Sequence, residues 1–415
     1  MKHIRLLLCI ALAALILTTC NAAQPPPDDY APEYIQIGYE QFCVSLTELN
    51  LRSNRLTNDD ILPLRHMVNL TILDLGNNQI SDISAIGGLT NLNTLLLGQN
   101  RISDISPIAG LTGLTRLSLS HNQISNISAL SGMSVLQDLN MVNNYISDIS
   151  PLSGLTSLTI LHLGQNQIST LPPLSGLENL RTLSVTNNLI TDISPLWGLN
   201  VAGLELGINQ ITDISPLAGL PNLTRLVLWR NEVTDISALS ELTQLTSLNL
   251  SLNQVSDLAP LAELTELTNL RLDHNPIGDL SPIAGLIQLT TLDIRNGGIS
   301  DLSALSGLIY LERLSLDDNQ ISDVTPLSGL INMDWLRLAE NQISDLVPLS
   351  YLVNLTELEL GKNQVRDVSP LTDLSVLRFV CLLDNPVDDF TPLEHLSMVC
   401  VRGECLHFPV IYYCE

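Results

Sequence analysis

The sequence predicts an α/β solenoid, an arc with a parallel β-sheet on its concave face and short 3-10 or α-helical turns on its convex face. Two features of the 415-residue chain support this prediction. The pattern Leu-x-Leu-x-x-Asn recurs about every 22 residues, and Ser followed by Pro or Ala comes six residues after most of its asparagines. A constant period of this length is typical of stacked turns around one continuous core. The asparagines of the pattern are Asn54, Asn78, Asn100, Asn122, Asn144, Asn166, Asn188, Asn209, Asn231, Asn253, Asn275, Asn319, Asn341, Asn363 and Asn385.

A single repeat shows why these residue types favour such a turn. Leu73 and Leu75 alternate with polar or small residues, so both are expected to point inward from a short strand. Asn78 follows where the chain bends, and its buried amide needs hydrogen-bond partners, which the backbone groups of stacked turns can supply. Gly297 occupies the position where one repeat would carry its Asn. We therefore expect a weak point at Gly297, repaired by water.

The convex turns are predicted by segments such as Ser106-Pro107, because Ser is favoured as an N-cap and Pro at the first helical position. Gly110 then ends the element after about one turn. Aspartate stands four residues after most of the asparagines, and either a row of calcium sites or a row of caps that accept backbone N–H bonds would explain it. Asn126 and Thr170 fill two of these positions and keep an oxygen acceptor without the charge, which favours capping. The aspartates are Asp82, Asp104, Asp148, Asp192, Asp213, Asp235, Asp257, Asp279, Asp301, Asp323, Asp345, Asp367 and Asp389.

The N-terminus has the composition of a secretion signal, with positive residues before a short apolar run. Residues 1–20 are assigned to this signal, whose end Leu17-Thr18-Thr19-Cys20 resembles the lipobox of bacterial lipoproteins. Lipidation of Cys20 would make the chain a surface-anchored protein, whereas ordinary cleavage near Ala22 or Ala23 would release it. The remaining segments are a Pro-rich linker (21–33), an N-terminal cap with the first repeat (34–66), the repeats (67–387) and a cysteine-containing C-terminal cap (388–415).

Cysteine usage also indicates export. Four cysteines crowd the C-terminal end, and one or two disulfides among them are expected in an exported chain. A zinc site formed with His407 is the alternative for the last three of them. Cys43 is expected to be a buried free thiol. The disulfide candidates are Cys381, Cys400, Cys405 and Cys414.

The 22-residue unit L-x-x-L-x-L-x-x-N-Q-I-S-D-I-S-P-L-x-G-L resembles the leucine-rich repeats of bacterial internalins and related surface proteins. The resemblance extends from about Leu46 to Pro386. It implies a protein that recognises host or cell-surface proteins along its concave sheet. No immunoglobulin-like domain is expected after the repeats, and no wall-anchoring signal, so host-cell invasion is not implied.

Composition narrows the classes of partner. The net charge of −25 and a pI near 4.4 argue against nucleic acid and against adsorption to anionic lipid. The chain lacks the G-x-S-x-G, H-E-x-x-H, P-loop and dinucleotide-binding patterns, so no enzyme activity and no cofactor are predicted. We expect a monomer with an extracellular or cell-surface protein as partner and at most an N-terminal lipid as membrane attachment.

The outward strand positions change character from Arg225 onward, where Arg and Trp replace Gly, Ser and Thr. Arg and Trp are enriched in interface hot spots. At a strand spacing of ~4.8 Å these positions would span roughly 25 Å, enough for one standard protein interface. We call the following residues the concave patch: Arg225, Trp229, Arg230, Asn249, Arg271, His274, Arg295, Trp335 and Arg337.

A structural role is the alternative for the charges of the concave patch. Opposite charges on neighbouring strands form ladders that stabilise a sheet. The expected neighbours are Arg295 with Asp273 and Asp317, Arg271 with Asp293, and Arg337 with Glu359. Protein recognition is the function predicted from the sequence, and a glycan-binding adhesin and a passive envelope protein are the alternatives.

Overall fold

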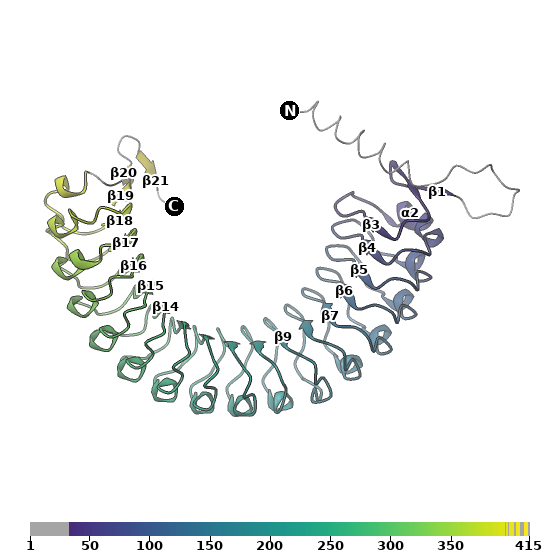
Figure 1. The fold of residues 1–415 in the computed structure, drawn as a ribbon, viewed down its shortest axis with the longest axis horizontal. Coiled ribbons are helices and arrows are strands. Elements are labelled where there is room, and N and C mark those ends of the chain that lie inside the picture. The colour runs from purple at the N-terminus through teal and green to yellow at the C-terminus, as the bar shows by residue number, and fades with distance from the viewer. Residues whose placement is uncertain (1–32, 395, 397, 402–403, 407–410, 414–415) are drawn as a thin grey trace, which may run out of the picture. The chain divides into compact units, whose positions relative to one another are not determined.

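The computed structural model describes residues 33–394, 396, 398–401, 404–406 and 411–413. The predicted signal with Cys20, residues 21–32 of the predicted linker, and the side chains of Cys405 and Cys414 lie outside the described part. The chain divides into two compact units, Met1–His162 (unit 1) and Leu163–Glu415 (unit 2). Within each unit, parallel strands line the inner side of the curve and 3-10 turns line the outer side (Figure 1).

Unit 1 opens with an antiparallel pair of strands, β1 (Tyr34–Ile37) and β2 (Glu40–Cys43), and β1 packs near α2 (Asn58–Ile61) and η1 (Leu62–His66). A parallel sheet follows. Its strands are β3 (Glu48–Asn50), β4 (Ile72–Asp74), β5 (Thr94–Leu96), β6 (Arg116–Ser118), β7 (Asp138–Asn140) and β8 (Ile160–His162). The 3-10 turns are η2 (Ser84–Ile86), η3 (Ser106–Ile108), η4 (Ser128–Leu130) and η5 (Ser150–Leu152).

Unit 2 continues the same design and ends in two antiparallel strands. Its parallel strands are β9 (Thr182–Ser184), β10 (Gly203–Glu205), β11 (Arg225–Val227), β12 (Ser247–Asn249), β13 (Asn269–Arg271), β14 (Thr291–Asp293), β15 (Arg313–Ser315), β16 (Trp335–Arg337), β17 (Glu357–Glu359), β18 (Phe379–Cys381) and β19 (Met398–Val401). The antiparallel strands are β20 (Glu404–Leu406) and β21 (Ile411–Tyr413). The 3-10 turns are η6 (Ser194–Leu196), η7 (Ser215–Gly219), η8 (Ser237–Leu239), η9 (Ala259–Leu261), η10 (Ser281–Ile283), η11 (Ser303–Leu305), η12 (Thr325–Leu327), η13 (Val347–Tyr351), η14 (Ser369–Leu371) and η15 (Thr391–Leu393).

The core consists of the leucines and isoleucines that the period places inward. Leu73, Leu75, Ile80 and Ile83 are all fully buried, and successive strands pair their central leucines in register, as Leu73 does with Leu95. The predicted fold class, a leucine-rich α/β solenoid, is confirmed. Paired residues of β9 and β10 are 21 positions apart in the sequence, whereas those of β10 and β11 are 22 apart. The shorter repeat therefore does not change which residues pair.

The asparagines of the pattern are paired with backbone groups, as the sequence predicts, and the half-buried Asn100 is an example. Asn100 donates through Nδ2 to the carbonyl of Leu97 in its own repeat (3.1 Å) and to that of Leu75 in the repeat before (2.9 Å). Its Oδ1 accepts the N–H of Ile80 at 3.0 Å. Each amide therefore fastens two turns together, and it does so through backbone groups of both.

At Gly297 the structure shows a backbone repair that the sequence does not predict. The Gly297 carbonyl accepts the N–H groups of Ile277 (3.1 Å) and Gly278 (3.0 Å), and its own N–H donates to Oδ1 of Asn319 (3.0 Å). Positive φ angles at Asn296 (51°), Gly298 (71°) and Gly278 (69°) turn the backbone into this arrangement. A backbone oxygen thus replaces the missing amide oxygen.

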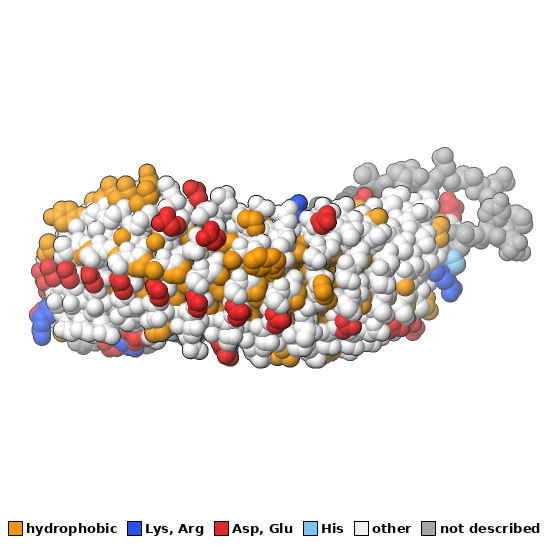
Figure 2. Space-filling model, turned by 90° about the horizontal axis from the view of Figure 1, so that it is seen from below, with side chains coloured by type: hydrophobic (Ala, Val, Ile, Leu, Met, Phe, Trp, Pro, Cys, Tyr) orange, Lys and Arg blue, Asp and Glu red, His pale blue; other side chains and the backbone are white. Residues whose placement is uncertain are grey.

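The aspartate row caps the convex turns. Oδ1 of Asp104 accepts the N–H of Ser106 at 2.8 Å, and Asn126 makes the same contact with Ser128 at 3.0 Å. Two hydrogen bonds lower the pKa of Asp104: the one from the Ser106 backbone N–H has the larger effect, and the one from the Ser106 hydroxyl adds to it. Figure 2 shows acidic side chains following one another along the face of the 3-10 turns. In the described residues no three His, Cys, Asp or Glu side chains are grouped to hold a metal ion.

The prediction that Ser caps these turns is wrong. Ser106 is the first residue of η3, and the N-cap position belongs to Ile105, which makes no side-chain cap bond. Because the Asp104 carboxylate already takes the Ser106 N–H, the serine enters the turn and Pro107 follows as its second residue.

The cysteine predictions need two corrections. Cys43 and Cys400 each belong to a disulfide, so Cys43 is not the free thiol predicted from the sequence. Cys381 is a half-buried free thiol and not a disulfide partner. Its register neighbour Cys400 is engaged in a bond to another cysteine, and burial raises the pKa of the Cys381 thiol to about 11. No helix among the described residues is long and apolar enough to cross a membrane.

Candidate functional site

The concave patch lies on the strand face of unit 2 and in the bends that follow the strands. Register pairing aligns the first residues of β11 to β16 in one column and the third residues in a second column. The first column is Arg225, Ser247, Asn269, Thr291, Arg313 and Trp335, and the second is Val227, Asn249, Arg271, Asp293, Ser315 and Arg337.

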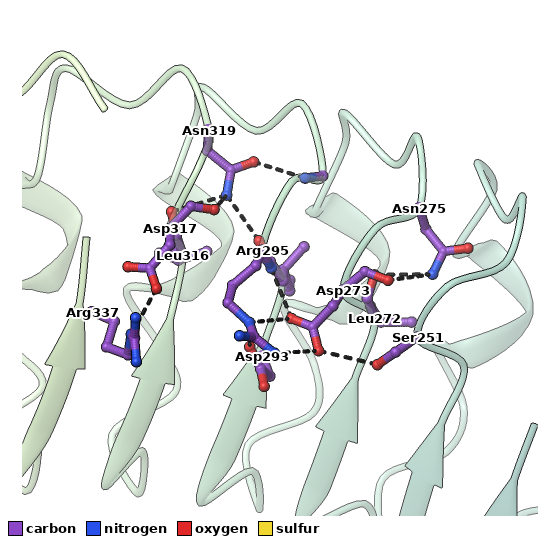
Figure 3. A network of polar contacts seen from close by, with 12 residues as sticks. Ser251, Leu272, Asp273, Asn275, Asp293, Arg295, Leu316, Asp317, Asn319 and Arg337 are labelled. Atoms are coloured by element: carbon purple, nitrogen blue, oxygen red, sulfur yellow. Dashed lines mark hydrogen bonds and ion pairs between the residues drawn. The ribbon is translucent and has the colours of Figure 1, made fainter. Parts of the chain in front are cut away.

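Arg295 is held between two carboxylates (Figure 3). Its Nε donates to Oδ1 of Asp273 (3.1 Å) and to Oδ1 of Asp293 (3.2 Å), and its backbone N–H also donates to Asp273 (3.0 Å). The Ser251 hydroxyl donates to the other oxygen of Asp273 at 3.1 Å. Because Asp273 is only 4% exposed, its charge depends on these partners and not on water.

Asp273 and Asp293 respond differently to this environment. Burial, together with the hydrogen bond to Asp273 and the charge of Asp273, raises the pKa of Asp293 to about 7. Burial acts upward on Asp273 as well, but hydrogen bonds from Asp293 and Arg295 outweigh it and lower the pKa of Asp273. When the pair holds one proton, that proton therefore resides on Asp293.

A second cluster joins Arg337, Asp317 and Trp335. Nε of Arg337 donates to Oδ2 of Asp317 at 2.6 Å, and the N–H of Ala339 donates to the other oxygen at 2.9 Å. The guanidinium carbon of Arg337 lies 5.7 Å from the centre of the Trp335 ring. A cation at this distance from an indole face is attracted to it. The half-buried indole and the guanidinium are thus fixed relative to each other.

Trp229 is placed by the residue that neighbours it on the preceding repeat. A Cβ added to Gly207 would collide with the indole of Trp229, so the missing side chain at Gly207 makes room for the ring. Arg225 of the same repeat pairs with Glu205 at 3.0 Å. Arg230 follows Trp229 in the bend, where it is exposed and has a φ of 56°.

The structure brings the predicted residues into two groups. Arg225, Trp229 and Arg230 lie together at β11, and the second group lies at β13 to β16. Asn249 lies between them on β12, and its Oδ1 accepts the N–H of Ser251 at 3.0 Å. His274 is exposed in the bend after β13. The second group consists of Arg271, His274, Arg295, Trp335 and Arg337.

The predicted ion-pair partners are only partly right. Arg295 does pair with Asp273, but its second partner is Asp293 and not Asp317. Arg295 reaches back to Asp273 of the preceding repeat, because that carboxylate is buried and needs a counter-charge.

The same reason applies to Arg337. Its register neighbour is Glu359, as the sequence predicts, but its ion pair is with Asp317. Arg271 lies beside Asp293 in register, and within the described chain it makes no ion pair.

Sequence reasoning missed the role of two residues in this site. Gly207 is one of the Gly, Ser and Thr positions before Arg225 to which the sequence assigns no role, and it accommodates Trp229. Asp273 is predicted from the sequence as a neighbour of Arg295, but its burial at the centre of the Arg295 network is not. The sequence does offer one indication of this role: Asp273 stands two residues after a strand, at a position where most other repeats carry Gly, Ser or Thr.

Family models decide the classification. The model described as Leucine Rich repeats (2 copies) matches residues 90–132, 134–176, 156–196, 200–241, 221–263, 243–285, 265–307 and 331–373, and the model described as Leucine rich repeat matches residues 44–102. The chain belongs to the leucine-rich repeat family. A comparison with curated proteins finds no match.

Solved structures place this leucine-rich repeat protein near the internalins. An internalin, InlF, from Listeria monocytogenes is 35% identical with a TM-score of 0.69, over 72% of this chain and 90% of that one. The functional domain of InlJ from Listeria monocytogenes is 24% identical with a TM-score of 0.69, over 83% and 76%. A plant peptide hormone receptor, RGFR1, in complex with RGF2 shares the fold at 20% identity and a TM-score of 0.52, over 86% and 74%. The chain is therefore an internalin-like leucine-rich repeat protein.

Proposed function

We propose that this protein is an exported recognition protein that binds another protein through the concave patch of unit 2. Membership of the internalin-like leucine-rich repeat proteins supports protein recognition in general. The plant receptor of the same fold is in complex with RGF2, which gives one case in which such a solenoid holds a ligand. The concave patch is the part of unit 2 with the residue types that favour an interface.

The observation that carries the proposal is the cluster of Trp335, Arg337 and Asp317. Trp and Arg are the residue types most enriched in hot spots, and here both are ordered before any partner arrives. Ordering a flexible side chain at an interface costs ~0.5–1.5 kcal/mol, so a Trp335 indole already held by the Arg337 guanidinium, which Asp317 fixes in turn, favours binding. Trp229, seated over Gly207, provides a second ordered aromatic side chain.

The arginines divide into two sets with different roles. Arg225, Arg295 and Arg337 already neutralise carboxylates of the protein, so they hold the patch together. Arg230 and Arg271 are exposed and make no ion pair in the described part of the chain. Within the concave patch, these two cations are the ones available to acidic groups of a partner protein.

Affinity capture tests the proposal. The double variant Trp229→Ala, Trp335→Ala should fold normally and lose the proteins that the parent chain captures. Trp197→Ala is the matched control, because Trp197 is 61% exposed and directly follows η6 on the outer side of unit 2. Retention of the same captured proteins by the double variant would refute the patch. Binding to a glycan array that the double variant loses would instead favour the adhesin alternative.

Export and a lipid anchor at Cys20 belong to the same proposal. Cys43 and Cys400, each of which is half of a disulfide, support export, because disulfides persist in oxidising compartments. Mass spectrometry of the mature protein is expected to find a diacylglycerol-modified Cys20 at its N-terminus. A mature chain that begins at Ala23 or Gln24 would refute the anchor and leave a freely secreted protein.

A further inference from the structure

Unit 1 has a hollow of about 460 Å³ on its strand face, and the proposed function does not involve it. Small residues, among them Gly98, Ser118 and Ser120, form its floor, and longer side chains from neighbouring repeats form its rim. Its volume lies in the range of small-ligand sites, about 300–1,000 Å³. The rim includes Arg52, Gln99, Arg116, His121, Asn140 and His162.

Three side-chain acceptors of the rim, those of Asn140, Gln99 and Asp138, are already used within the protein. Oδ1 of Asn140 accepts the N–H of Val142 at 3.1 Å, and Oε1 of Gln99 lies 3.5 Å from Nη2 of Arg52. Asp138, an acidic residue on the rim, is paired with Arg116 at 3.2 Å. A ligand entering the hollow therefore finds few free acceptors.

The donors of the same side chains remain free. The amide nitrogens of Asn140 and Gln99 and the guanidinium of Arg52 have no acceptor other than Gln99 Oε1 in the described part of the chain. Nδ1 of His121 lies 2.8 Å from the amide nitrogen of Asn143. Because an amide nitrogen can only donate, the His121 proton lies on Nε2, which adds a further donor.

Charge favours the same kind of ligand. The chain carries 43 acidic and 18 basic residues, so a site with an unpaired arginine and one neutralised carboxylate differs from most of its surface. Arg52 is exposed and makes no ion pair among the described residues. An arginine fork with neighbouring N–H donors matches the two oxygens of a carboxylate.

We propose that this hollow, between Arg52, His121 and Asn140, binds a carboxylate-bearing ligand of about the size of an acidic amino-acid residue. The donors available to the carboxylate oxygens are the Arg52 guanidinium, Nε2 of His121 and Nδ2 of Asn140, all from residues that line the hollow. The source of the carboxylate is either a free acid or the acidic end of a polypeptide. The site lies wholly in unit 1, so it does not depend on the concave patch.

Fluorescence anisotropy with the whole exported chain tests this site. The probes are a labelled Gly-Ser-Gly-Glu peptide with a free C-terminus and its Gly-Ser-Gly-Gln amide. Free glutamate is the competitor. Asn140→Asp is the decisive variant, because it keeps the acceptor for Val142 N–H and replaces the donor with a negative charge. Asn126→Asp is the control, since it makes the same change at a cap position on the convex side.

The acidic peptide is expected to bind at least about ten-fold more tightly than the amide, since hydrogen bonds to a charged group contribute ~1.5–3 kcal/mol. Asn140→Asp should lose this preference, and Asn126→Asp should keep it. Displacement by free glutamate would identify free acids as ligands, and binding of the peptide alone would identify polypeptide ends. Equal binding of both peptides, no binding of either peptide or glutamate, or an unchanged preference in Asn140→Asp would overturn the proposal.

Discussion

Asn319 supports the repeat that lacks its own asparagine, so Asn319→Ala is expected to destabilise the fold more than the same change in a regular repeat. Its Oδ1 accepts the N–H groups of Gly297 (3.0 Å) and Ile299 (2.9 Å), and its Nδ2 donates to the carbonyl of Ile294 (2.8 Å). These three groups have no other hydrogen bond in the described part of the chain. A buried group left without a partner costs about 1–3 kcal/mol, so the three together cost roughly 3 kcal/mol or more.

Asn341→Ala is the matched comparison. Asn341 is the sole partner of one group, the N–H of Ile321 (3.0 Å). The carbonyls of Leu316 and Leu338, to which it also donates, each accept from another asparagine as well. The expected cost is therefore about 1–3 kcal/mol. Urea unfolding followed by circular dichroism compares the two variants with the parent protein. A loss for Asn319→Ala no larger than that for Asn341→Ala would refute the reasoning about Gly297.

Three further predictions concern unit 2. The pKa of Asp293 is raised to about 7 in the folded chain. Its protonated form therefore stabilises the fold fully below its unfolded pKa near 4, and this stabilisation is lost as pH rises through about 7. Asp293→Asn should remove that part of the decline in the urea midpoint between pH 5 and 7.5, and an unchanged pH dependence would contradict the assignment. Gly207→Ala should displace the Trp229 indole and shift tryptophan fluorescence, whereas Gly110→Ala, with open space at its Cβ, should not. Leu252 has a φ of 57° and is 41% exposed, so Leu252→Asn should raise the free energy of unfolding by up to about 1 kcal/mol, and a lower urea midpoint would contradict this.

The fold was predictable because each repeat repeats the same physical requirements. Leu73 and Leu75 must point inward at every turn, and Asn78 must find backbone partners, so a period read from the sequence fixes the core. The aspartate row was also within reach, since Asn126 keeps the acceptor and loses the charge. Assigning the cap to Ser106 failed because Ser and Asp both favour helix starts and composition alone does not rank two candidates two residues apart.

The details of the concave patch were less predictable. The sequence gives the column of every outward residue, and these columns were correct for Arg337 and Glu359. It does not give the direction in which a long side chain leans. Arg337 turns to Asp317 because that carboxylate is buried and Glu359 is not fully so. The hollow of unit 1 was missed for a related reason, since Gly98 and Ser120 become a floor only when longer side chains surround them.

The buried acids of unit 2 also limit what the arginines can contribute to recognition. A guanidinium that neutralises Asp273 or Asp317 cannot turn to a partner without leaving a buried charge uncompensated, at a cost of about 3–5 kcal/mol. For a partner carboxylate near Arg295, the net binding free energy would therefore be the energy of the new ion pair reduced by the cost of leaving Asp273 without its counter-charge. The exposed Arg271 makes no ion pair within the described chain, so binding to a partner would leave no buried carboxylate uncompensated. Substituting Arg271 should therefore weaken binding through the partner alone, whereas substituting Arg295 should weaken the fold first, and this difference separates the recognition role of the patch from its structural role.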